Sequence, residues 1–352
     1  MLLIPPLPLV RAEGDPHALG HAHGRERGPD LRDFLDDGLA RLNHLLPEPV
    51  TLAGLSPSIT AYRTVIEDAL PDLAAETEGL AEGAGLTLTE AYLLQLRREI
   101  LGYRKVPALG DCTTYARSGA AARGLPVLAQ TVDLNGDLDD QITVLDVTPA
   151  GSRRRSLLLG FGGLLGYLGL NSSGLAVGIN LVLGGTWRPG VPPYLAVRHL
   201  LDRAGTVDEA LALLRTLPLA SSRCLTLCDS ERAVWAEHLE GRWRLGDGPQ
   251  TTHTNHYLHP DLVPGDEINV FARRSSVKRL QACRTALAAL PADASAEDHF
   301  AVLSAPPLCV PANGDIRRER TVAAAVLFPS RGELHLRPGD PSRHPTQVFA
   351  LR

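Results

Sequence analysis

The feature that most constrains the fold is a change of residue pattern at Cys112. Before it, apolar residues recur at helical spacing over residues 30–46, 61–80 and 88–101. After it, short runs typical of strands are found at 126–132, 141–147, 156–159, 175–183, 224–228, 233–237, 242–245, 251–255, 322–328, 333–336 and 347–351. Helices are expected to return at 194–217, 275–290 and 296–303. The helices come first, then strands, then a helical interlude, then strands again. This order predicts an α+β protein with stacked layers.

Composition limits the classes of protein to which the chain can belong. Of its 352 residues 44% are hydrophobic and 21% are charged, and the net charge is -5, so general disorder and a basic nucleic-acid-binding surface are both excluded. No apolar run reaches the roughly 18 residues that cross a bilayer, and the first residues do not resemble a signal peptide. Five irregularly spaced cysteines do not fit a disulfide framework. We therefore expect a cytoplasmic protein with neither a nucleic-acid nor a membrane partner.

The segment 110–114 lies where the helical region ends and the β region begins. A cysteine at the first position of a strand becomes a chain terminus if the bond before it, Asp111–Cys112, is cut. Its free α-amino group, with a pKa near 8, can then act as general base for its own thiol. Taken alone, these five residues fit a buried structural cysteine better than a nucleophile.

A set of short motifs in a fixed order reverses that preference. The motifs are D-C-T-T (111–114), A-Q-T-V-D (129–133), G-L-N-S-S-G-L-A-V-G-I-N (169–180), G-V-P (190–192), T-H-T-N-H (252–256), R-S-S-V-K-R (274–279), L-C (308–309) and T-V-A-A-A-V (321–326). They are preceded by A-L-G-H-A-H-G (18–24) and G-L-A-E-G-A-G (79–85). The ordered set resembles the acyl-coenzyme A:isopenicillin N (6-aminopenicillanic acid) acyltransferase family. These proteins are cysteine N-terminal-nucleophile hydrolases, more distantly related to acid ceramidases and bile-salt hydrolases.

The resemblance implies a four-layer αββα sandwich in which two antiparallel sheets face each other between helices. Residues 1–111 would form a mostly helical pro-segment, which becomes the α-subunit on cleavage and packs on a catalytic core of residues 112–352. Both parts would belong to one structural domain, and a homo-oligomer is one possible assembly.

The resemblance also implies a self-cleaving amidase or acyltransferase that acts on C–N bonds other than ordinary peptide bonds. The Cys112 thiolate would attack an amide or thioester carbonyl, and water or an amine would then release the acyl group. The partner would be a small-molecule amide or acyl donor, with an acyl thioester as one option. No metal or organic cofactor is expected.

Roles of individual residues follow from their positions in the family's motifs. Cys112 would supply the thiolate and, after cleavage, the α-amine, which Asp133 would orient or charge-balance. Asn255 would donate its amide N–H to the oxyanion of the tetrahedral intermediate, a contact worth about 3 kcal/mol in comparable sites. Asn180 would hydrogen-bond the amine or the substrate. The supporting or substrate-binding residues would be Thr113, Thr254, His256 and Glu237.

Two positions depart from the family pattern. The family often has an arginine after the cysteine that aligns with Cys309, whereas this chain has Val310. Asp111 stands where the penicillin-pathway enzymes have glycine, and it could assist or slow the acyl shift that precedes cleavage. The candidates to replace the missing arginine are Arg317, Arg318 and Arg320.

Two other functions stay open. One is an uncleaved, non-catalytic small-molecule-binding protein on the same fold. The other is a papain-type cysteine hydrolase that uses His253 or His256 as its base. A metal site is not supported, because the candidate groups lack further ligands at suitable spacing. These groups are His17, His21 and His23, and Cys224 and Cys228.

Overall fold

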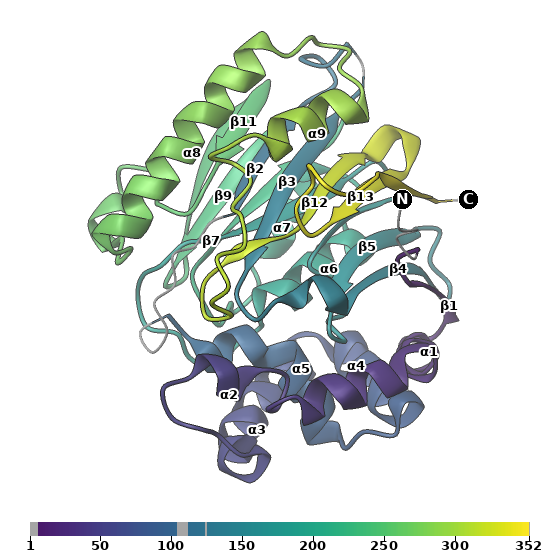
Figure 1. Cartoon of the computed structure of the whole chain (residues 1–352). Helices are drawn as coiled ribbons and strands as arrows, with labels where there is room; N and C mark the ends of the chain where they lie inside the picture. The colour runs from purple at the N-terminus through teal and green to yellow at the C-terminus, as the bar shows by residue number, and fades with distance from the viewer. Residues whose placement is uncertain (1–5, 104–111, 124, 352) are drawn as a thin grey trace.

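The strands form two sheets. The computed structural model describes residues 6–103, 112–123 and 125–351 (Figure 1). One sheet has eight strands in the order β1 (Leu9–Gly14), β4 (Ile142–Pro149), β5 (Ser156–Phe161), β6 (Leu168–Asn171), β7 (Ala176–Leu181), β8 (Arg223–Cys228), β9 (Ala233–Leu239) and β10 (Arg242–Gly248). The other has six strands in the order β11 (Gln250–His253), β2 (Thr113–Arg117), β3 (Val127–Leu134), β12 (Arg320–Phe328), β13 (Glu333–Pro338) and β14 (Gln347–Ala350).

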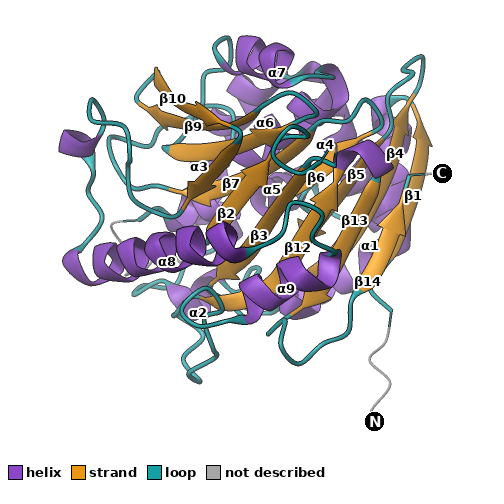
Figure 2. Ribbon diagram, turned by 90° about the horizontal axis from the view of Figure 1, so that it is seen from above, coloured by secondary structure: helices purple, strands orange, loops and turns teal. Residues whose placement is uncertain are grey.

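The two sheets face each other, and helices cover their outer faces. Strands β2 and β3 of the smaller sheet contact β7 and β8 of the larger one. Helices α6 (Pro193–Arg203) and α7 (Val207–Leu214) pack on the larger sheet. Helices α8 (Val270–Ala289) and α9 (Ala296–Ser304) pack on the smaller sheet (Figure 2). The predicted α+β class and the four αββα layers are therefore confirmed.

One strand pairing differs from the predicted antiparallel sheets. Strand β1 pairs with β4 in parallel, with Leu9 opposite Val144 and Ala12 opposite Val147. The other pairings among the described strands are antiparallel. The N-terminal region therefore contributes a strand to the core sheet, which the sequence analysis did not predict.

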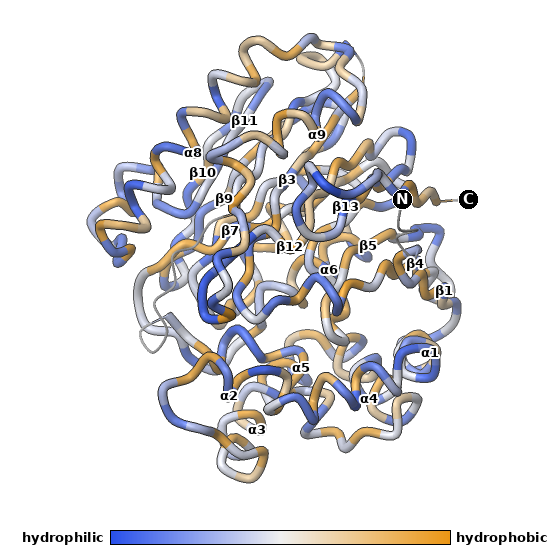
Figure 3. The backbone as a smooth tube through the Cα atoms, viewed as in Figure 1, coloured by the Kyte–Doolittle hydropathy of each residue, from blue (hydrophilic) through white to orange (hydrophobic). Residues whose placement is uncertain are grey.

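Burial on both faces explains why the inner strands are so apolar. Strands β5 and β8 are buried at every position, because the facing sheet covers one side and a helix layer covers the other. Hydropathy colouring shows β4 and β5 as largely hydrophobic, whereas α8 alternates between hydrophobic and hydrophilic residues (Figure 3). Such two-sided burial produces the near-continuous apolar runs that predicted these strands.

The helices that precede Cys112 lie together at one end of the sandwich (Figure 1). They are α1 (Pro16–Asp36), α2 (Leu42–Leu45), α3 (Leu52–Ala69), α4 (Pro71–Ala84) and α5 (Leu88–Leu101). Within the part of the chain that the structure describes, every helix is too short or too polar to span a bilayer.

Two of the predicted helices have other bounds. The helix predicted over 30–46 is instead the end of α1, a turn and the short α2, because φ is positive from Gly38 to Arg41. The helix predicted over 61–80 is two helices that meet at Leu70. Pro71 begins the second one, since proline fits the first turn of a helix but not its interior.

The helix predicted over 88–101 is confirmed as α5. Its N-cap is Thr87, which forms a capping box with Glu90. At the start of α7 the Thr206 side chain likewise accepts a hydrogen bond from the Glu209 backbone N–H.

Helices α1 and α4 pack with their backbones in contact. A Cβ on Gly20 would lie 1.8 Å from a carbonyl oxygen of α4, and one on Gly79 would lie 2.0 Å from the carbonyl oxygen of His17. Gly24 and Gly83 extend the same close approach. The glycine spacing in the two upstream motifs is therefore a packing requirement between two helices.

Candidate active site

Cys112 lies immediately before β2 and is buried, with 3% of its surface exposed. Its Sγ accepts a hydrogen bond from the Asp133 backbone N–H at 3.4 Å and lies 3.8 Å from the Tyr167 hydroxyl. Burial, together with the nearby Asp133 carboxylate, raises the pKa of the thiol to about 12. In the uncut chain the sulfur is therefore a neutral thiol rather than a thiolate at physiological pH.

Asp133 lies near the end of β3, the strand that pairs with β2. Two hydroxyl groups form hydrogen bonds with its carboxylate. Thr131 donates to one oxygen at 3.2 Å, and Thr321 of β12 donates to the other at 2.6 Å. Val310, at the position where the family often has arginine, donates its backbone N–H to the same Thr321 hydroxyl at 2.9 Å. The strand next to Cys112 thus presents a fixed, buried carboxylate.

Arg279 of α8 connects the nucleophile to the predicted oxyanion residue. This fully buried guanidinium donates to the Cys112 carbonyl oxygen at 2.8 Å, to the Thr113 hydroxyl at 3.0 Å and to the Asn255 Oδ1 at 2.9 Å. Asn180 of β7 donates its amide N–H to the same Cys112 carbonyl at 3.1 Å. Cys112 is therefore held by its own carbonyl group, from both the α8 side and the β7 side.

Asn255 follows β11, and its side chain reaches the cavity that Cys112 lines. One of its amide hydrogens is donated to the Leu181 carbonyl at 2.9 Å. A primary amide carries two hydrogens, so one remains for a substrate oxygen. The bond from Arg279 to Oδ1 fixes which edge of the amide is the donor.

The remaining predicted residues, Glu237, Thr254 and His256, form a hydrogen-bond network next to Asn255 that does not line the Cys112 cavity. Glu237 accepts from His253 Nε2 at 2.8 Å and from the backbone N–H of Leu258 at 2.6 Å, so it fixes the loop after β11. Burial lowers the pKa of His256 to about 4, and its Nδ1 lies 2.7 Å from the Ser276 hydroxyl. Thr254 accepts from that same hydroxyl at 2.9 Å.

The cavity beside Cys112 has an empty volume of about 380 Å³. Three of the predicted residues, Cys112, Asp133 and Asn255, line this cavity. Thr113 and Asn180 do not line it, and Asn180 contacts the Cys112 carbonyl instead. The described residues that line it are Arg98, Cys112, Asp133, Leu134, Asn135, Tyr167, Ile179, Leu181, Tyr194, Arg223, Asn255 and Glu319. His253, Thr254, His256 and Glu237 are not among them.

The expected replacements for the missing family arginine are wrong. Arg317 and Arg318 pair with the nearby Asp315, and Arg320 pairs with Asp137 and Asp139 away from the cavity. Among the described residues, the arginines that reach Cys112 or its cavity are Arg98 of α5, Arg223 of β8 and Arg279 of α8. Asp111, predicted to flank the cleavage point, lies outside the described residues.

Sequence reasoning missed several residues of this site. Tyr167 lies in a glycine-containing segment, 160–169, in which no residue was singled out. Arg279 closes the motif R-S-S-V-K-R but was not singled out within it. Arg98 lies in an ordinary helical pattern, and no local feature of the sequence marks it as a site residue.

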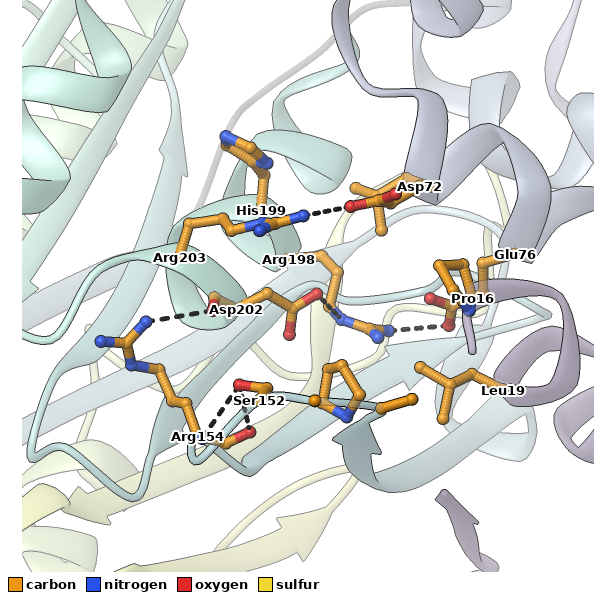
Figure 4. A pocket seen from close by; sticks show the side chains of 14 residues that line it. Pro16, Leu19, Asp72, Glu76, Ser152, Arg154, Arg198, His199, Asp202 and Arg203 are labelled. Atoms are coloured by element: carbon orange, nitrogen blue, oxygen red, sulfur yellow. Dashed lines mark hydrogen bonds and ion pairs between the residues drawn. The ribbon is translucent and has the colours of Figure 1, made fainter. Parts of the chain in front are cut away.

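A larger cavity, with about 1120 Å³ of space, lies between α1, α4, α6 and the turn after β4 (Figure 4). Its charged groups are largely paired with one another: Arg198 with Glu76 and Asp202, each at 2.8 Å, and Arg203 with Asp72. Among its described lining residues, Ser152 carries the one hydroxyl group, and that hydroxyl bonds to the Arg154 backbone rather than to a base. This cavity is a charged seam between the N-terminal helices and the core.

Residues 121–343 match the model of the family described as AAT: Acyl-coenzyme A:6-aminopenicillanic acid acyl-transferase. The chain belongs to this family. The resemblance inferred from the ordered motifs is thereby confirmed. Three of those motifs, including Asp111–Thr114, lie before the matched region and extend the likeness toward the N-terminus.

The acyltransferase family includes a relative from Emericella nidulans, the acyl-coenzyme A:6-aminopenicillanic-acid-acyltransferase 40 kDa form. It is 24% identical over 265 residues, which cover 74% of this chain and 72% of that protein. Among solved structures, penicillin V acylase from Agrobacterium tumefaciens matches with a TM-score of 0.48 and 14% identity over 68% of this chain and 86% of its own. The Caenorhabditis elegans N-acylethanolamine-hydrolyzing acid amidase ortholog matches with a TM-score of 0.45 and 16% identity over 68% of this chain and 100% of its own.

Proposed function

We propose that this protein is a self-cleaving cysteine amidase or acyltransferase whose nucleophile is Cys112. The observation that carries the proposal is the position of Cys112, immediately before β2, with its sulfur beside a cavity and its carbonyl held by Asn180 and Arg279. A residue held in this way keeps its place if the peptide bond before it is cut. Family membership supports the same chemistry for a small-molecule amide or acyl donor.

Cleavage of the Asp111–Cys112 bond gives the Cys112 thiol a general base within the same residue. In the uncut chain the thiol pKa of about 12 keeps the sulfur protonated. The N-to-S shift places the Asp111 acyl group on Sγ, and hydrolysis of that thioester frees the α-amine of Cys112. An α-amine has a pKa near 8, and the ammonium group that forms beside the sulfur lowers the thiol pKa, so the thiol proton passes to the amine and leaves a thiolate beside an ammonium group. The buried Asp133 carboxylate stabilises that ammonium group.

The thiolate then attacks the carbonyl carbon of the substrate amide. Negative charge collects on the carbonyl oxygen, where the second amide hydrogen of Asn255 stabilises it. When the C–N bond breaks, the leaving amine takes the proton from the α-ammonium, and the acyl group stays on Sγ as a thioester. Water, or a second amine, attacks the thioester and gives its proton to the α-amine, and the C–S bond breaks to restore the thiolate.

Residues 1–111 are proposed to remain bound after cleavage. Strand β1 is paired within the core sheet, and the buried ion pair Glu76–Arg198 joins α4 to α6 at the charged seam (Figure 4). Arg98 of α5 lines the Cys112 cavity, so the site is incomplete without this segment. The two fragments therefore stay together, and the N-terminal one completes the wall of the cavity.

Intact-mass measurement and N-terminal sequencing of the purified protein test the proposal. We expect two fragments, with Cys112 as the first residue of the larger one, and amide hydrolysis across a panel of N-acyl compounds. Cys112→Ala should leave one chain and abolish both results. Cys283→Ala is the matched control, because Cys283 is also a buried free cysteine but lies in α8 and does not line the cavity.

Other outcomes distinguish the alternatives. An unbroken chain that binds amides without turnover indicates the non-catalytic binding protein. An unbroken chain that is active and loses its activity on His256→Ala indicates the papain-type hydrolase. His256 lies outside the cavity lining and its Nδ1 is close to the Ser276 hydroxyl, which argues against the papain-type hydrolase.

A further inference from the structure

A second cavity adjoins the Cys112 cavity on the side of the N-terminal helices. It has an empty volume of about 490 Å³. Residues that line both cavities are Arg98, Leu134, Asn135, Tyr167 and Tyr194, so these residues form a shared neck. The other described lining residues are Phe34, Leu94, Gln95, Arg97, Leu138, Phe161, Gly162 and Leu164. The body of this cavity is therefore apolar and rich in aromatic rings.

The charge of the second cavity has one sign. Arg97 and Arg98 line it, and no Asp or Glu is among its described lining residues. Arg97 donates its Nε–H to the Ala40 carbonyl at 2.7 Å and lies over the Phe34 ring. Burial lowers the pKa of Arg97 to about 10, so the group still carries its charge at neutral pH. A cavity that is apolar and carries positive charge is complementary to a molecule with an apolar skeleton and an anionic group.

The neck and the wall next to it contain buried hydrogen-bond donors that have no acceptor. Arg98 Nη2, Arg97 Nη2 and Asn135 Nδ2 are all buried and have no hydrogen-bond partner among the described residues. Asn135 is almost fully buried, with 3% of its surface exposed. A buried donor without an acceptor lowers stability, and a charged one more so. An acceptor that a ligand brings into the cavity would satisfy all three donors.

The acidic groups lie at the other end of the connected space. Asp133 and Glu319 line the Cys112 cavity but not the second one. Arg98 and Arg223 also line the Cys112 cavity and offset the charge of these two acids, whereas the second cavity has arginines and no acid among its described lining residues. An anionic group of a substrate is therefore better accommodated at the second cavity. This polarity orients the substrate with its scissile carbonyl toward Cys112 and its anionic group toward Arg97 and Arg98.

We propose that Arg98, with Arg97 and Asn135, binds a carboxylate of the substrate, so that the substrate class is amides with a carboxylate on an apolar skeleton. The inference rests on the proposed function, because it assigns the half of the substrate that lies beyond the reacting carbonyl. The carboxylate accepts the three unpaired N–H groups, and the apolar skeleton contacts Phe34, Leu94 and the other apolar residues of the wall. Arg98 is then a specificity-determining residue supplied by the N-terminal segment.

Calorimetric binding to the purified protein tests this assignment with two simple probes, 4-phenylbutyrate and its neutral analogue 4-phenylbutyramide. Because charge-assisted hydrogen bonds in a buried site are strong, we expect the carboxylate to bind at least about tenfold more tightly. Arg98→Gln should reduce that preference to less than about threefold, and Arg98→Lys, which keeps the charge, should retain part of it. The matched control is Arg63→Gln, on α3 and outside both cavities, which should leave the preference unchanged.

Two results overturn the inference. One is the absence of any preference for the carboxylate, including the absence of binding by either probe. The other is a preference that Arg98→Gln does not change. If Cys112-dependent amide hydrolysis persists in either case, the proposed function stands without this substrate class. If the preference is present but Cys112→Ala does not affect hydrolysis, the binding site stands and the proposed nucleophile does not.

Kinetics on two substrate pairs distinguish the source of the carboxylate. The first pair, N-hexanoyl-leucine and N-hexanoyl-leucinamide, differs by a carboxylate on the leaving amine. The second pair, the mono-anilide of adipic acid and hexanoyl anilide, differs by a carboxylate on the acyl group. A higher kcat/KM for the acid of one pair, lost in Arg98→Gln, assigns that half of the substrate. Equal kcat/KM values within both pairs overturn the statement that the carboxylate belongs to the substrate.

Discussion

Replacement of Gly20 by alanine should destabilise the protein by about 2 kcal/mol, although alanine is the better helix former. Gly20 lies inside α1, where the exchange alone would stabilise the helix by about 1 kcal/mol. The new Cβ, however, would lie 1.8 Å from one carbonyl oxygen of α4 and 2.7 Å from the Leu80 backbone nitrogen. Both contacts are with backbone atoms, so no side chain can move aside.

The size of the effect follows from how far the helices must part. Non-bonded carbon atoms sit about 3.5–4 Å from their neighbours, so α1 and α4 must separate by more than about 1 Å. A gap of that size removes a quarter to a half of the dispersion energy along the contact. Overpacking costs about 1–3 kcal/mol and occasionally more, and a contact of 1.8 Å with backbone belongs at the upper end, about 3 kcal/mol. After the gain of about 1 kcal/mol in helix propensity, a net loss of about 2 kcal/mol remains.

Urea unfolding monitored by circular dichroism measures the change. Cys112→Ala is the background for both proteins, so that cleavage does not alter the number of chains. The control is Gly54→Ala in α3, where the new Cβ meets only the Thr51 hydroxyl at 3.3 Å. We expect this variant to be as stable as its parent or more stable. Equal stability of the Gly20 and Gly54 variants would refute the backbone-contact explanation of the glycine motifs.

Three further predictions concern the site and its surroundings. Arg279→Lys should lower kcat at least about tenfold, because a single nitrogen cannot occupy the places of the two guanidinium nitrogens that contact Cys112 and Asn255, whereas the exposed neighbour Lys278→Arg should have no effect. Burial raises the pKa of Glu76 from 4.5 to about 7, so the folded state holds a proton that the unfolded state has lost, and stability should fall as the pH rises from 4.5 to 7. Urea unfolding across that range should show a flatter dependence for Glu76→Gln. His256→Gln should keep kcat within about tenfold, while Cys112→Ala abolishes it; a loss of several orders of magnitude would point to histidine as the base.

The sequence predicted the layers well because the inner strands are buried on two faces and the helices on one. The strands of 156–159 and 224–228 were found within two residues at each end, since two-sided burial leaves a continuous apolar run. The break at Leu70 was missed because the helical spacing of apolar residues continues on both sides of it. β1 was missed because its partner, β4, is far away in the chain and leaves no local signal.

For the site, the ordered motifs predicted the residues that lie beside Cys112 in the chain or in adjoining strands. Asp133 and Asn255 share the cavity with it, as their motif positions implied. Arg279 could not be selected in this way, because it meets the Cys112 carbonyl only after α8 packs across β2. Arg98 depends on how α5 docks on the core, which is a property of the assembled layers rather than of any one motif.

The position of Arg97 and Arg98 would give the N-terminal helices a role that outlasts the proposed cleavage. The groups proposed to carry out the reaction at Cys112 come from residues 112–352, but the charge that would select the substrate comes from α5. The glycine contact between α1 and α4 holds the helix layer to which α5 belongs, and the Glu76–Arg198 pair fixes that layer to α6. A change that loosens this layer should therefore weaken the preference for carboxylates before it affects the reaction of the thiolate. Selectivity and catalysis would then be separable by mutation, because they reside in different fragments of one chain.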